Sequence, residues 1–195
     1  MNIQLPRPAH AHDLEAAREA AFALLARGAV DRRSPIHTPN LATIGADGAP
    51  RLRTLVLRSF DPASRSLRLH TDRRSEKASE IIADPRVSLH GYDPEQRIQL
   101  RLQCLASLHC DDAVAEAGWN ASRDFSRMCY AITPGPGHPA AAPPPAPTDA
   151  VSGRENFAVI QLIFNEMEWL WLAADGHRRA RFTWGQQPIA TWLVP

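Results

Sequence analysis

Hydrophobic residues in the first part of the chain repeat at the spacing of a single helical face. They recur every three or four positions in a stretch rich in Ala, Leu and Glu, which is typical of an amphipathic helix. The residues of this face are Leu14, Ala17, Ala21 and Leu24. Because Asp13 can cap the start and Gly28 can end it, the pattern predicts a helix over residues 13–27.

Much of the remaining chain alternates between hydrophobic and polar residues with the period of two that marks β-strands. The clearest case is the run 97–109, where Ile98, Leu100, Leu102 and Cys104 face one side. Clusters of turn-forming residues at 45–48 and 61–64 separate other strand-like runs. The expected strands span residues 41–45, 51–59, 66–71, 86–92, 97–109, 156–164, 166–174 and 178–184.

Two more helices and a proline-rich segment interrupt these strands. A short helix is expected over 75–83, where Asp84-Pro85 stops it, and a longer one from 111 to about 128. Residues 133–153 are too rich in Pro and Ala to pack as a regular element, so we expect an extended, polyproline-like arm. The arm is either a linker without a role of its own or a partner-binding segment.

This order of elements predicts a mainly-β fold, a β-barrel with flanking helices. Short antiparallel strands that close into a small barrel leave few sheet edges unpaired. The segment that follows the arm is too short to fold alone. We therefore expect residues 1–195 to form a single domain that carries helix 13–27 and arm 133–153.

Composition and charge narrow the classes of function. The formal net charge of +1 argues against a nucleic-acid partner. No apolar run is long enough to span a membrane, and residues 1–15 lack the apolar middle of a secretory signal. Cys104, Cys110 and Cys129 lack C-x-x-C spacing, so we expect no metal site and no disulfide, but free thiols in the cytoplasm.

A cluster of basic residues lies where a strand is expected to run into the second helix. Arg73, Arg74 and Lys77 crowd the helix start, although the first turn already carries partial positive charge. A bound anion such as phosphate would explain them. Alternatively, Asp72 and Glu76 neutralise the turn and the arginines face water, as charge runs usually do.

The order of several motifs along the chain resembles that of a known family. RLRTLVLRSFD is followed by LHTDRRSEKASEI, DPRVSLHGY, a strand centred on Gln99, a helix start at Trp119 to Ser122, and HRRARFTW. This order resembles the pyridoxamine 5'-phosphate oxidase-like FMN-binding split-barrel family, and its FMN-binding branch more than the vitamin B6 enzyme. The resemblance covers about residues 39–195 apart from the arm. It implies a six-stranded antiparallel split barrel and a homodimer with FMN at the subunit interface.

The resemblance also implies which residues contact the cofactor, and it favours phosphate as the explanation for the basic cluster. Arg53 would reach the FMN phosphate and Gln99 the pyrimidine edge of the flavin. Two positions depart from the family, because Glu76 replaces a cation and Arg58 replaces a lysine. The implied cofactor-binding residues are Arg53, Thr54, Leu55, Val56, Leu57, Arg58, His70, Thr71, Arg74, Ser75, Lys77, Gln99, Trp171 and Arg181.

On the substrate side, the resemblance implies Arg58, His177 and Arg179, with His177 able to accept or donate a proton. The stretch 107–122 is acidic and lacks the residues with which the B6 enzyme holds its substrate phosphate. Its acidic residues are Asp111, Asp112 and Glu116. We therefore expect an FMN-dependent oxidoreductase acting on an unidentified small molecule. The alternatives are a non-catalytic flavin storage or sensor protein, and a split barrel that binds haem or a deazaflavin.

Overall fold

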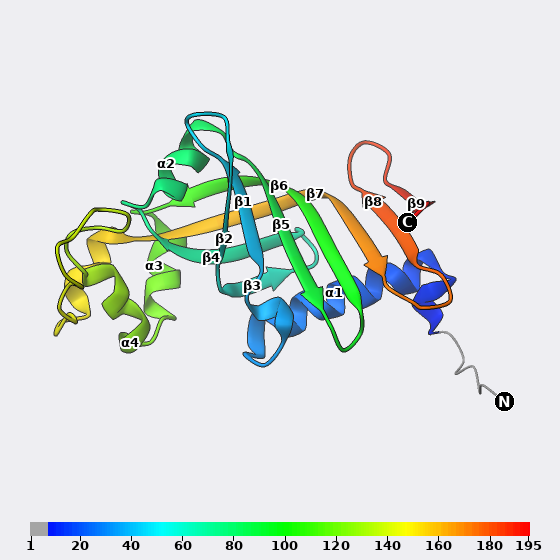
Figure 1. The fold of residues 1–195 in the computed structure, drawn as a ribbon, viewed down its shortest axis with the longest axis horizontal. Coiled ribbons are helices and arrows are strands. Elements are labelled where there is room, and N and C mark those ends of the chain that lie inside the picture. The colour runs from blue at the N-terminus through cyan, green and yellow to red at the C-terminus, as the bar shows by residue number, and fades with distance from the viewer. Residues whose placement is uncertain (1–7) are drawn as a thin grey trace.

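A computed structural model describes residues 8–195 as a curved antiparallel sheet, with one long helix along one side and shorter helices at one end (Figure 1). The strands are β1 (Asn40–Ile44), β2 (Pro50–Thr54), β3 (Leu57–Asp61), β4 (Ser66–Asp72), β5 (Arg86–Asp93), β6 (Ile98–His109), β7 (Phe157–Trp171), β8 (Arg178–Thr183) and β9 (Ile189–Leu193). The α-helices are α1 (Leu14–Val30), α2 (Glu76–Ala83), α3 (Ala113–Asn120) and α4 (Asp124–Arg127). Short 3-10 helices are η1 (Ala9–Ala11), η2 (Pro35–His37), η3 (Met128–Ala131) and η4 (Val151–Asn156). The expectation about a secretory signal falls partly on residues 1–7, which lie outside the described residues.

The strands form one sheet in the order β2-β1-β5-β6-β7-β4-β3, and β8 and β9 extend it from β7. The expected mainly-β class with flanking helices is confirmed, but the six strands that the resemblance implied are wrong, because residues 8–195 contain nine. One cause lies at residues 51–59, which form two strands rather than one. β2 pairs with β1 whereas β3 pairs with β4, so the chain must leave one partner before it joins the next.

β7 is a single strand where the sequence pattern predicted two. Its buried positions fall on Ile160, Leu162 and Phe164, and then on Met167 and Trp169. This change of parity separates the two apparent strands in the sequence. The pairing of β6 with β7 shifts register between Gln103 and Cys104, which face Glu166 and Phe164, so Asn165 is the extra residue of a β-bulge. The bulge restores the alternation, and β7 continues as the longest strand.

α1 confirms the predicted N-terminal helix but extends beyond its predicted end. The Asp13 carboxylate accepts from the Ala16 N–H at 2.8 Å, which satisfies an unpaired donor of the first turn. Gly28 does not end the helix, because α1 continues to Val30. A Cβ at Gly28 would lie 2.9 Å from the backbone of Ile36. This glycine therefore serves the close packing of α1 on η2 instead of capping the helix.

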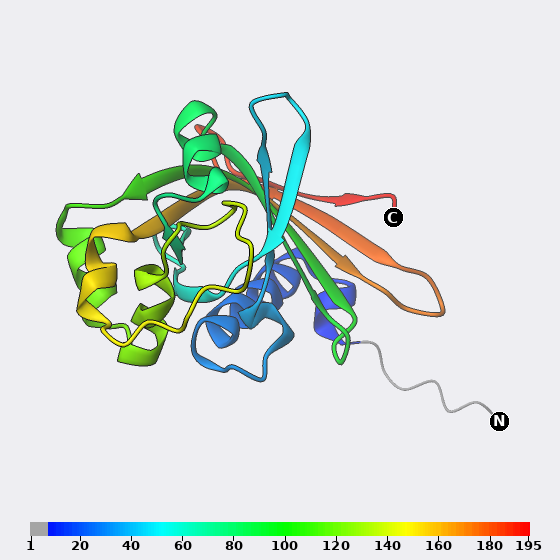
Figure 2. The ribbon, with the colours of Figure 1, turned by 60° about the vertical axis from the view of Figure 1, so that its left-hand side comes forward.

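The helix expected from 111 to about 128 is broken into α3, α4 and η3. Arg127 stabilises the break, because its guanidinium donates to the Trp119 carbonyl at 2.9 Å and 3.2 Å. The arm that follows has no regular element over residues 133–150, most of which are exposed, but its last three residues, 151–153, belong to η4 and are not extended. Figure 2 shows it looping out beside η4 and the short helices.

The main core lies between α1 and the concave face of the sheet. It is built by the inward residues of the strands, among them Leu41, Leu69, Leu100 and Trp169, together with the buried face of α1. Full burial of each large aliphatic side chain contributes about 1.5–3 kcal/mol. A second cluster of Trp119, Tyr130, Phe157 and Val159 fixes the short helices on the end of β7.

Within residues 8–195, no helix is long and apolar enough to cross a membrane. The same residues contain no group of three or more His, Cys, Asp or Glu side chains that could hold a metal ion. All three cysteines are free.

Candidate functional site

Polar groups gather at the first turn of α2, where the end of β4 delivers them. β4 pairs in regular register with β7 up to Asp72, and Ser75 takes the N-cap position of α2. The hydroxyls of Thr71 and Ser75 are buried and lie 3.3 Å apart. The Lys77 ammonium donates to the Thr71 hydroxyl at 3.4 Å. The helix start therefore presents two hydroxyls and a cation together.

Arg53 reaches the same helix from β2. Its guanidinium donates to the Glu80 carboxylate of α2 at 2.8 Å and to the Thr43 hydroxyl, which also donates to Glu80. Glu80 is buried, whereas 21% of the Arg53 side chain stays exposed. The network thus fixes Arg53 against α2 and leaves part of its guanidinium accessible.

Lys77 is a half-buried cation without a carboxylate partner in the described part of the chain, where its one hydrogen bond is to Thr71. Burial and then the charge of Arg53 lower the pKa of Lys77, although Asp72, Glu80 and Glu76 act in the opposite direction. An anion bound beside Lys77 and Arg53 would offset both effects. This set of donors at a helix N-terminus fits a phosphate group.

Arg73 and Arg74 hold the neighbouring segments rather than facing this turn. Arg74 forms a two-pronged ion pair with Asp72, at 3.0 Å and 2.6 Å. It also donates to the carbonyls of Tyr130 and Ile132, at the start of the arm. Arg73 pairs with Asp111 at 3.1 Å. The structure therefore brings Arg53, Thr71, Ser75 and Lys77 together, and it directs Arg74 away from them.

The link between β2 and β3 carries the residues predicted to lie along the flavin ring. Thr54 ends β2 and donates to the Asn40 side chain at 2.8 Å. Leu55 and Val56 are half-buried, whereas Leu57 begins β3 and is fully buried. The Leu55 N–H donates to the Pro39 carbonyl at 3.0 Å, and the Leu57 side chain belongs to the core.

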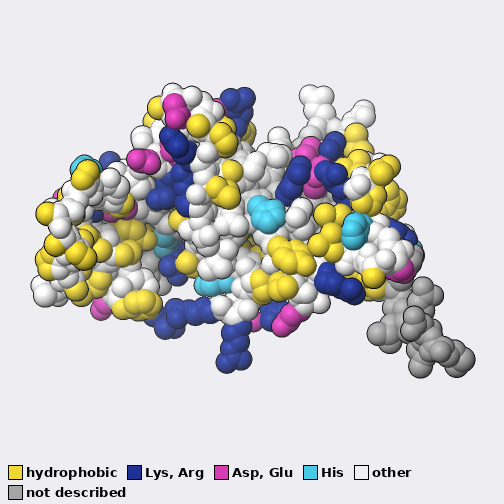
Figure 3. Space-filling model, viewed as in Figure 1, with side chains coloured by type: hydrophobic (Ala, Val, Ile, Leu, Met, Phe, Trp, Pro, Cys, Tyr) yellow, Lys and Arg dark blue, Asp and Glu magenta, His cyan; other side chains and the backbone are white. Residues whose placement is uncertain are grey.

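Gln99, Arg179 and Arg181 lie together on the convex face of the sheet, opposite α1. In one row across β6, β7 and β8, the cross-strand partners are Gln99, Leu170 and Arg179. In the next row on the same face, they are Arg101, Glu168 and Arg181. Figure 3 shows basic and acidic side chains grouped over β7 and β8 on this face. We call the set Gln99, Arg101, Glu168, Arg179 and Arg181 the convex-face platform.

Trp171 and His177 lie apart from the platform. Trp171 is buried on the concave side, where its ring packs edge to face against His10 at 5.6 Å. Because successive strand residues point to opposite faces, it cannot join Gln99 and Arg181 at one surface. His177 lies in the β7–β8 connection, where its Nδ1 accepts from the Ala173 N–H at 3.2 Å.

Arg58 and His70 line a basic cavity of about 380 Å³ between β3, β4, the end of α1 and the α3–α4 region. Among residues 8–195, no Asp or Glu lines it. The basic side chains that line it are Arg32, His37, Arg58, Arg68, His70 and Arg123. Burial and then the charge of Arg58 lower the pKa of His70 to about 4, so this imidazole is neutral at pH 7. The cavity is therefore suited to an anion.

The expectation of an acidic substrate region is corrected by these positions. The acidic side chains of the stretch 107–122 pair elsewhere: Asp111 with Arg73, Asp112 with His109 and the start of α3, and Glu116 with Arg154. The same stretch contributes Ser122 to the cavity, and Ser126 and Arg123 follow from the next residues. Sequence reasoning missed Arg32, Arg68 and Arg123, because four separate segments bring the arginines together.

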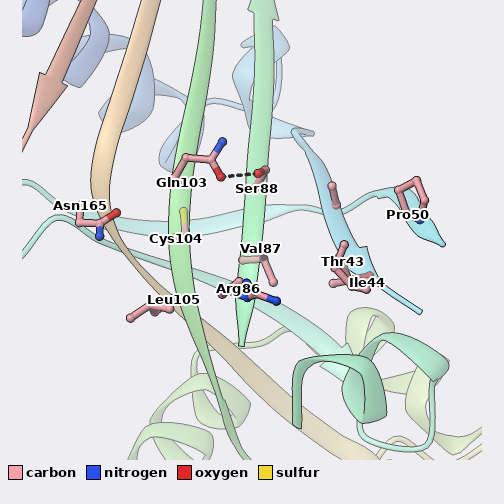
Figure 4. A pocket seen from close by; sticks show the side chains of 11 residues that line it. Thr43, Ile44, Pro50, Arg86, Val87, Ser88, Gln103, Cys104, Leu105 and Asn165 are labelled. Carbon is pink, nitrogen blue, oxygen red and sulfur yellow. Dashed lines mark hydrogen bonds between the residues drawn. The ribbon is translucent and has the colours of Figure 1, made fainter. Parts of the chain in front are cut away.

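A second, more open cavity of about 540 Å³ lies on the convex face beside β1, β5 and β6. Figure 4 shows Thr43, Ile44 and Pro50 on one side and Leu105 and Asn165 on the other, with Ser88 donating to Gln103 at 2.7 Å between them. Because Thr43 also bonds Arg53, this cavity adjoins the anion site. Sequence reasoning did not identify this cavity.

Comparisons with known proteins show which domains this chain is similar to. Residues 20–109 match the family model for the pyridoxamine 5'-phosphate oxidase FMN-binding domain, a segment that contains Arg53, Lys77 and Gln99. The pyridoxine/pyridoxamine 5'-phosphate oxidase 2 of Arabidopsis thaliana is 33% identical over 106 residues, which cover 51% of this chain and 53% of the relative. The corresponding oxidase of Microcystis aeruginosa is 40% identical over 63 residues, 32% of this chain and 28% of that protein. The chain thus spans about half the length, or less, of these curated relatives.

Solved structures share the fold over most of the chain. A pyridoxamine 5'-phosphate oxidase-related, FMN-binding protein of Nostoc punctiforme has a TM-score of 0.76 and 26% identity, covering 90% of this chain and 96% of that one. PhzG of Burkholderia lata, solved with tetrahydrophenazine-1-carboxylic acid, has a TM-score of 0.74 at 20% identity and full coverage of both chains, which shows a shared fold. The fold is a split barrel of this kind, and residues 20–109 are similar to the FMN-binding domain of the pyridoxamine 5'-phosphate oxidase family.

Proposed function

We propose that this protein binds FMN and uses it to oxidise or reduce a small anionic molecule. The observation that carries the proposal is the half-buried Lys77 at the start of α2, which has no carboxylate partner among the described residues and lies beside Arg53. Arg53, Thr71, Ser75 and Lys77 would hold the phosphate of FMN, and the matched domain family binds FMN. The charge of Glu76 acts on Lys77 by raising its pKa, although no ion pair joins the two side chains within residues 8–195.

A second copy of the chain would complete the flavin site. Along the sheet, β1, β5, β6 and β7 lie between Arg53 on β2 and Arg181 on β8. Adjacent strands are about 4.8 Å apart, so one chain separates the two groups by roughly 24 Å along the sheet. A homodimer brings the convex-face platform of one copy toward the phosphate site of the other. The cavity beside Thr43 and Leu105 is the surface that the partner would cover.

The bound flavin would supply the electron-transfer chemistry, while the protein binds and orients the reacting molecule. Arg58 lines the basic cavity and would attract an anionic group, with Arg123 and Ser126 as further donors. The planar guanidinium of Arg58 would orient the substrate. The curated relatives are named for phosphorylated pyridoxine and pyridoxamine, and the basic cavity suits a molecule with a phosphate or carboxylate group. Arg179 and His177 are predicted to act on the partner copy's flavin.

The binding test compares cations of the same region. A charge-assisted contact contributes about 1.5–3 kcal/mol, so Arg53→Ala and Lys77→Ala should each weaken FMN binding roughly ten- to a hundredfold. Arg73→Ala is the matched control, because Arg73 lies near the same turn but pairs with Asp111, and its effect should stay within about twofold. Quenching of FMN fluorescence gives the dissociation constants. Unchanged affinity in the Arg53 and Lys77 variants would show the phosphate assignment to be wrong.

A second experiment on the same protein distinguishes an oxidoreductase from a storage or sensor protein. Photoreduced flavoprotein is mixed with air and with candidate anionic electron donors and acceptors, and flavin absorbance is followed. Oxidation or reduction that saturates with one such molecule supports enzymatic turnover. A bound flavin that reacts no faster than free FMN with every molecule would favour the non-catalytic alternative.

A further inference from the structure

Glu168 is the centre of the convex-face platform. Its carboxylate accepts from Arg179 at 2.7 Å and from Arg181 at 2.8 Å and 3.2 Å, and it forms an ion pair with Arg101 at 3.1 Å. The Glu168 side chain is 5% exposed, whereas the three arginine side chains are 29–47% exposed. One buried carboxylate on β7 therefore organises guanidiniums from the strands on both of its sides.

A buried carboxylate at this position carries a desolvation cost that an apolar residue would avoid. Burial alone would raise the pKa of Glu168, but hydrogen bonds from Arg179 and Arg181 and the charge of Arg101 lower it. The carboxylate is thus ionised at pH 7. Without Glu168 the three arginine side chains would still be in contact with water. They therefore do not need the ion pairs with Glu168 to offset a cost of their own burial. What Glu168 adds is a fixed orientation, with the guanidiniums held along the sheet next to Gln99.

We propose that Glu168 is a positioning residue of the flavin site, which presets Arg179 and Arg181 so that they meet the edge of a bound flavin. The proposal rests on the proposed function, because it assumes that FMN reaches this platform. The flavin edge carries carbonyl oxygens that accept hydrogen bonds. Donors that are already oriented avoid the loss of side-chain freedom that binding would otherwise cost.

The sign of the effect distinguishes positioning from plain electrostatics. If Glu168 only reduced the positive charge of the platform, its removal would make the site more cationic and strengthen the binding of anionic FMN. If it positions the arginines, its removal lets them turn into solvent, and FMN binding weakens. The two roles therefore predict opposite changes in the same dissociation constant.

The test measures FMN affinity in Glu168→Gln, which keeps the size of the side chain and removes its charge. We expect affinity to fall about tenfold, as follows from releasing two long side chains. Glu166→Gln is the matched control, because Glu166 lies on the same face one row away and only approaches Arg181 at 3.8 Å. Its effect should stay within about twofold. Thermal unfolding of each variant shows which samples are folded.

A double-mutant cycle tests whether Glu168 acts through Arg181. In an Arg181→Gln background, Glu168→Gln should lose most of its effect, whereas a general structural role would leave that effect unchanged. Should Glu168→Gln fail to fold, Glu168→Asp keeps the charge but shortens its reach, and it should also weaken binding. Equal or tighter FMN binding in the folded variants overturns the positioning role. Absence of FMN binding by the unaltered protein would instead overturn the proposed function itself.

Discussion

Neighbouring basic residues at the start of α2 have different electrostatic environments. Arg74 is neutralised by Asp72 and ties down the beginning of the arm, and Arg73 pairs with Asp111 at the surface. Lys77 is half-buried and has no carboxylate partner in the described chain. The sequence could show that three cations crowd one turn. It could not show which of them was unpaired, because Arg73 pairs with Asp111, 38 residues away, and Arg74 also binds the Ile132 carbonyl, 58 residues away.

His70 gives the basic cavity a defined pH dependence. Its pKa is about 4 in the folded protein and about 6.5 when the chain is unfolded, so protons bind preferentially to the unfolded state between these values. Stability is therefore full above pH 6.5 and falls as the pH drops toward 4, by up to about 3 kcal/mol from this group. In His70→Gln this part of the loss should disappear.

Denaturant unfolding at pH 7.5, 5.5 and 4.5 measures the effect as the difference between unaltered protein and variant, which removes the contribution of carboxylates that titrate in both. His12→Gln, at an exposed histidine, is the control and should retain the pH dependence of the unaltered protein. A His70→Gln difference that does not change between these pH values would contradict a buried neutral imidazole in this cavity.

At the scale of elements, the sequence predicted strands in which hydrophobic and polar residues alternate regularly, but it did not show where that alternation is interrupted. The alternation of β6 correctly separated core residues such as Leu100 and Leu102 from the outward Gln99, because strand period and burial coincide there. The bulge at Asn165 was hidden, since a change of parity in one strand looks like two strands. The same limit applies to β2 and β3, whose separate partners are fixed by pairing across the sheet.

α1 provides a prediction at this scale. Ala is a better helix former than Gly by about 1 kcal/mol, so propensity alone predicts that Gly28→Ala stabilises the protein. The added Cβ would lie 2.9 Å from the Ile36 carbonyl carbon and oxygen, and backbone atoms cannot rotate away as a side chain does. We expect a net destabilisation of about 1–3 kcal/mol, typical of overpacking.

Urea unfolding provides the measurement, and Gly185→Ala provides the control. A Cβ at Gly185 meets nothing within 4 Å, so that variant should change stability by less than about 0.5 kcal/mol. A Gly28→Ala protein at least as stable as the unaltered one would mean that η2 yields to α1, and that the close contact does not require glycine.

At the scale of the whole molecule, sites are assembled from distant parts of the chain. The basic cavity takes its arginines from the end of α1, β3, β4 and the α3–α4 region, so only the fold makes them neighbours. The resemblance to a family singled out Arg58 and His70, because both lie in the motifs that carry it. It could not locate Arg32 or Arg123, whose importance depends on how the helices close over β3 and β4.

The convex face also exposes hydrophobic side chains that a solitary molecule would leave in water. Leu105 is 56% exposed, Leu52 68% and Ile163 45%, and Figure 3 shows hydrophobic side chains grouped on this face. Leu105 also lines the cavity next to Thr43. Since scattered exposed apolar residues are ordinary but grouped ones mark interfaces, these residues support the proposed homodimer.

If the protein is a homodimer, its mass in solution is twice the mass of one chain, and a substitution that disrupts the interface should halve that mass. Light scattering during gel filtration should give twice the 21.5 kDa chain mass, and Leu105→Glu should shift it to one chain, because two buried charges would be desolvated without partners. Val151→Glu, at a 72% exposed residue of η4 far along the chain from this surface, should leave the dimer intact.

If the flavin lies between the two copies, Leu105→Glu should also lose FMN although Arg53 and Lys77 are unchanged. A single-chain mass for the unaltered protein, or full FMN affinity in a monomeric Leu105→Glu, would place the cofactor within one chain and contradict the shared site.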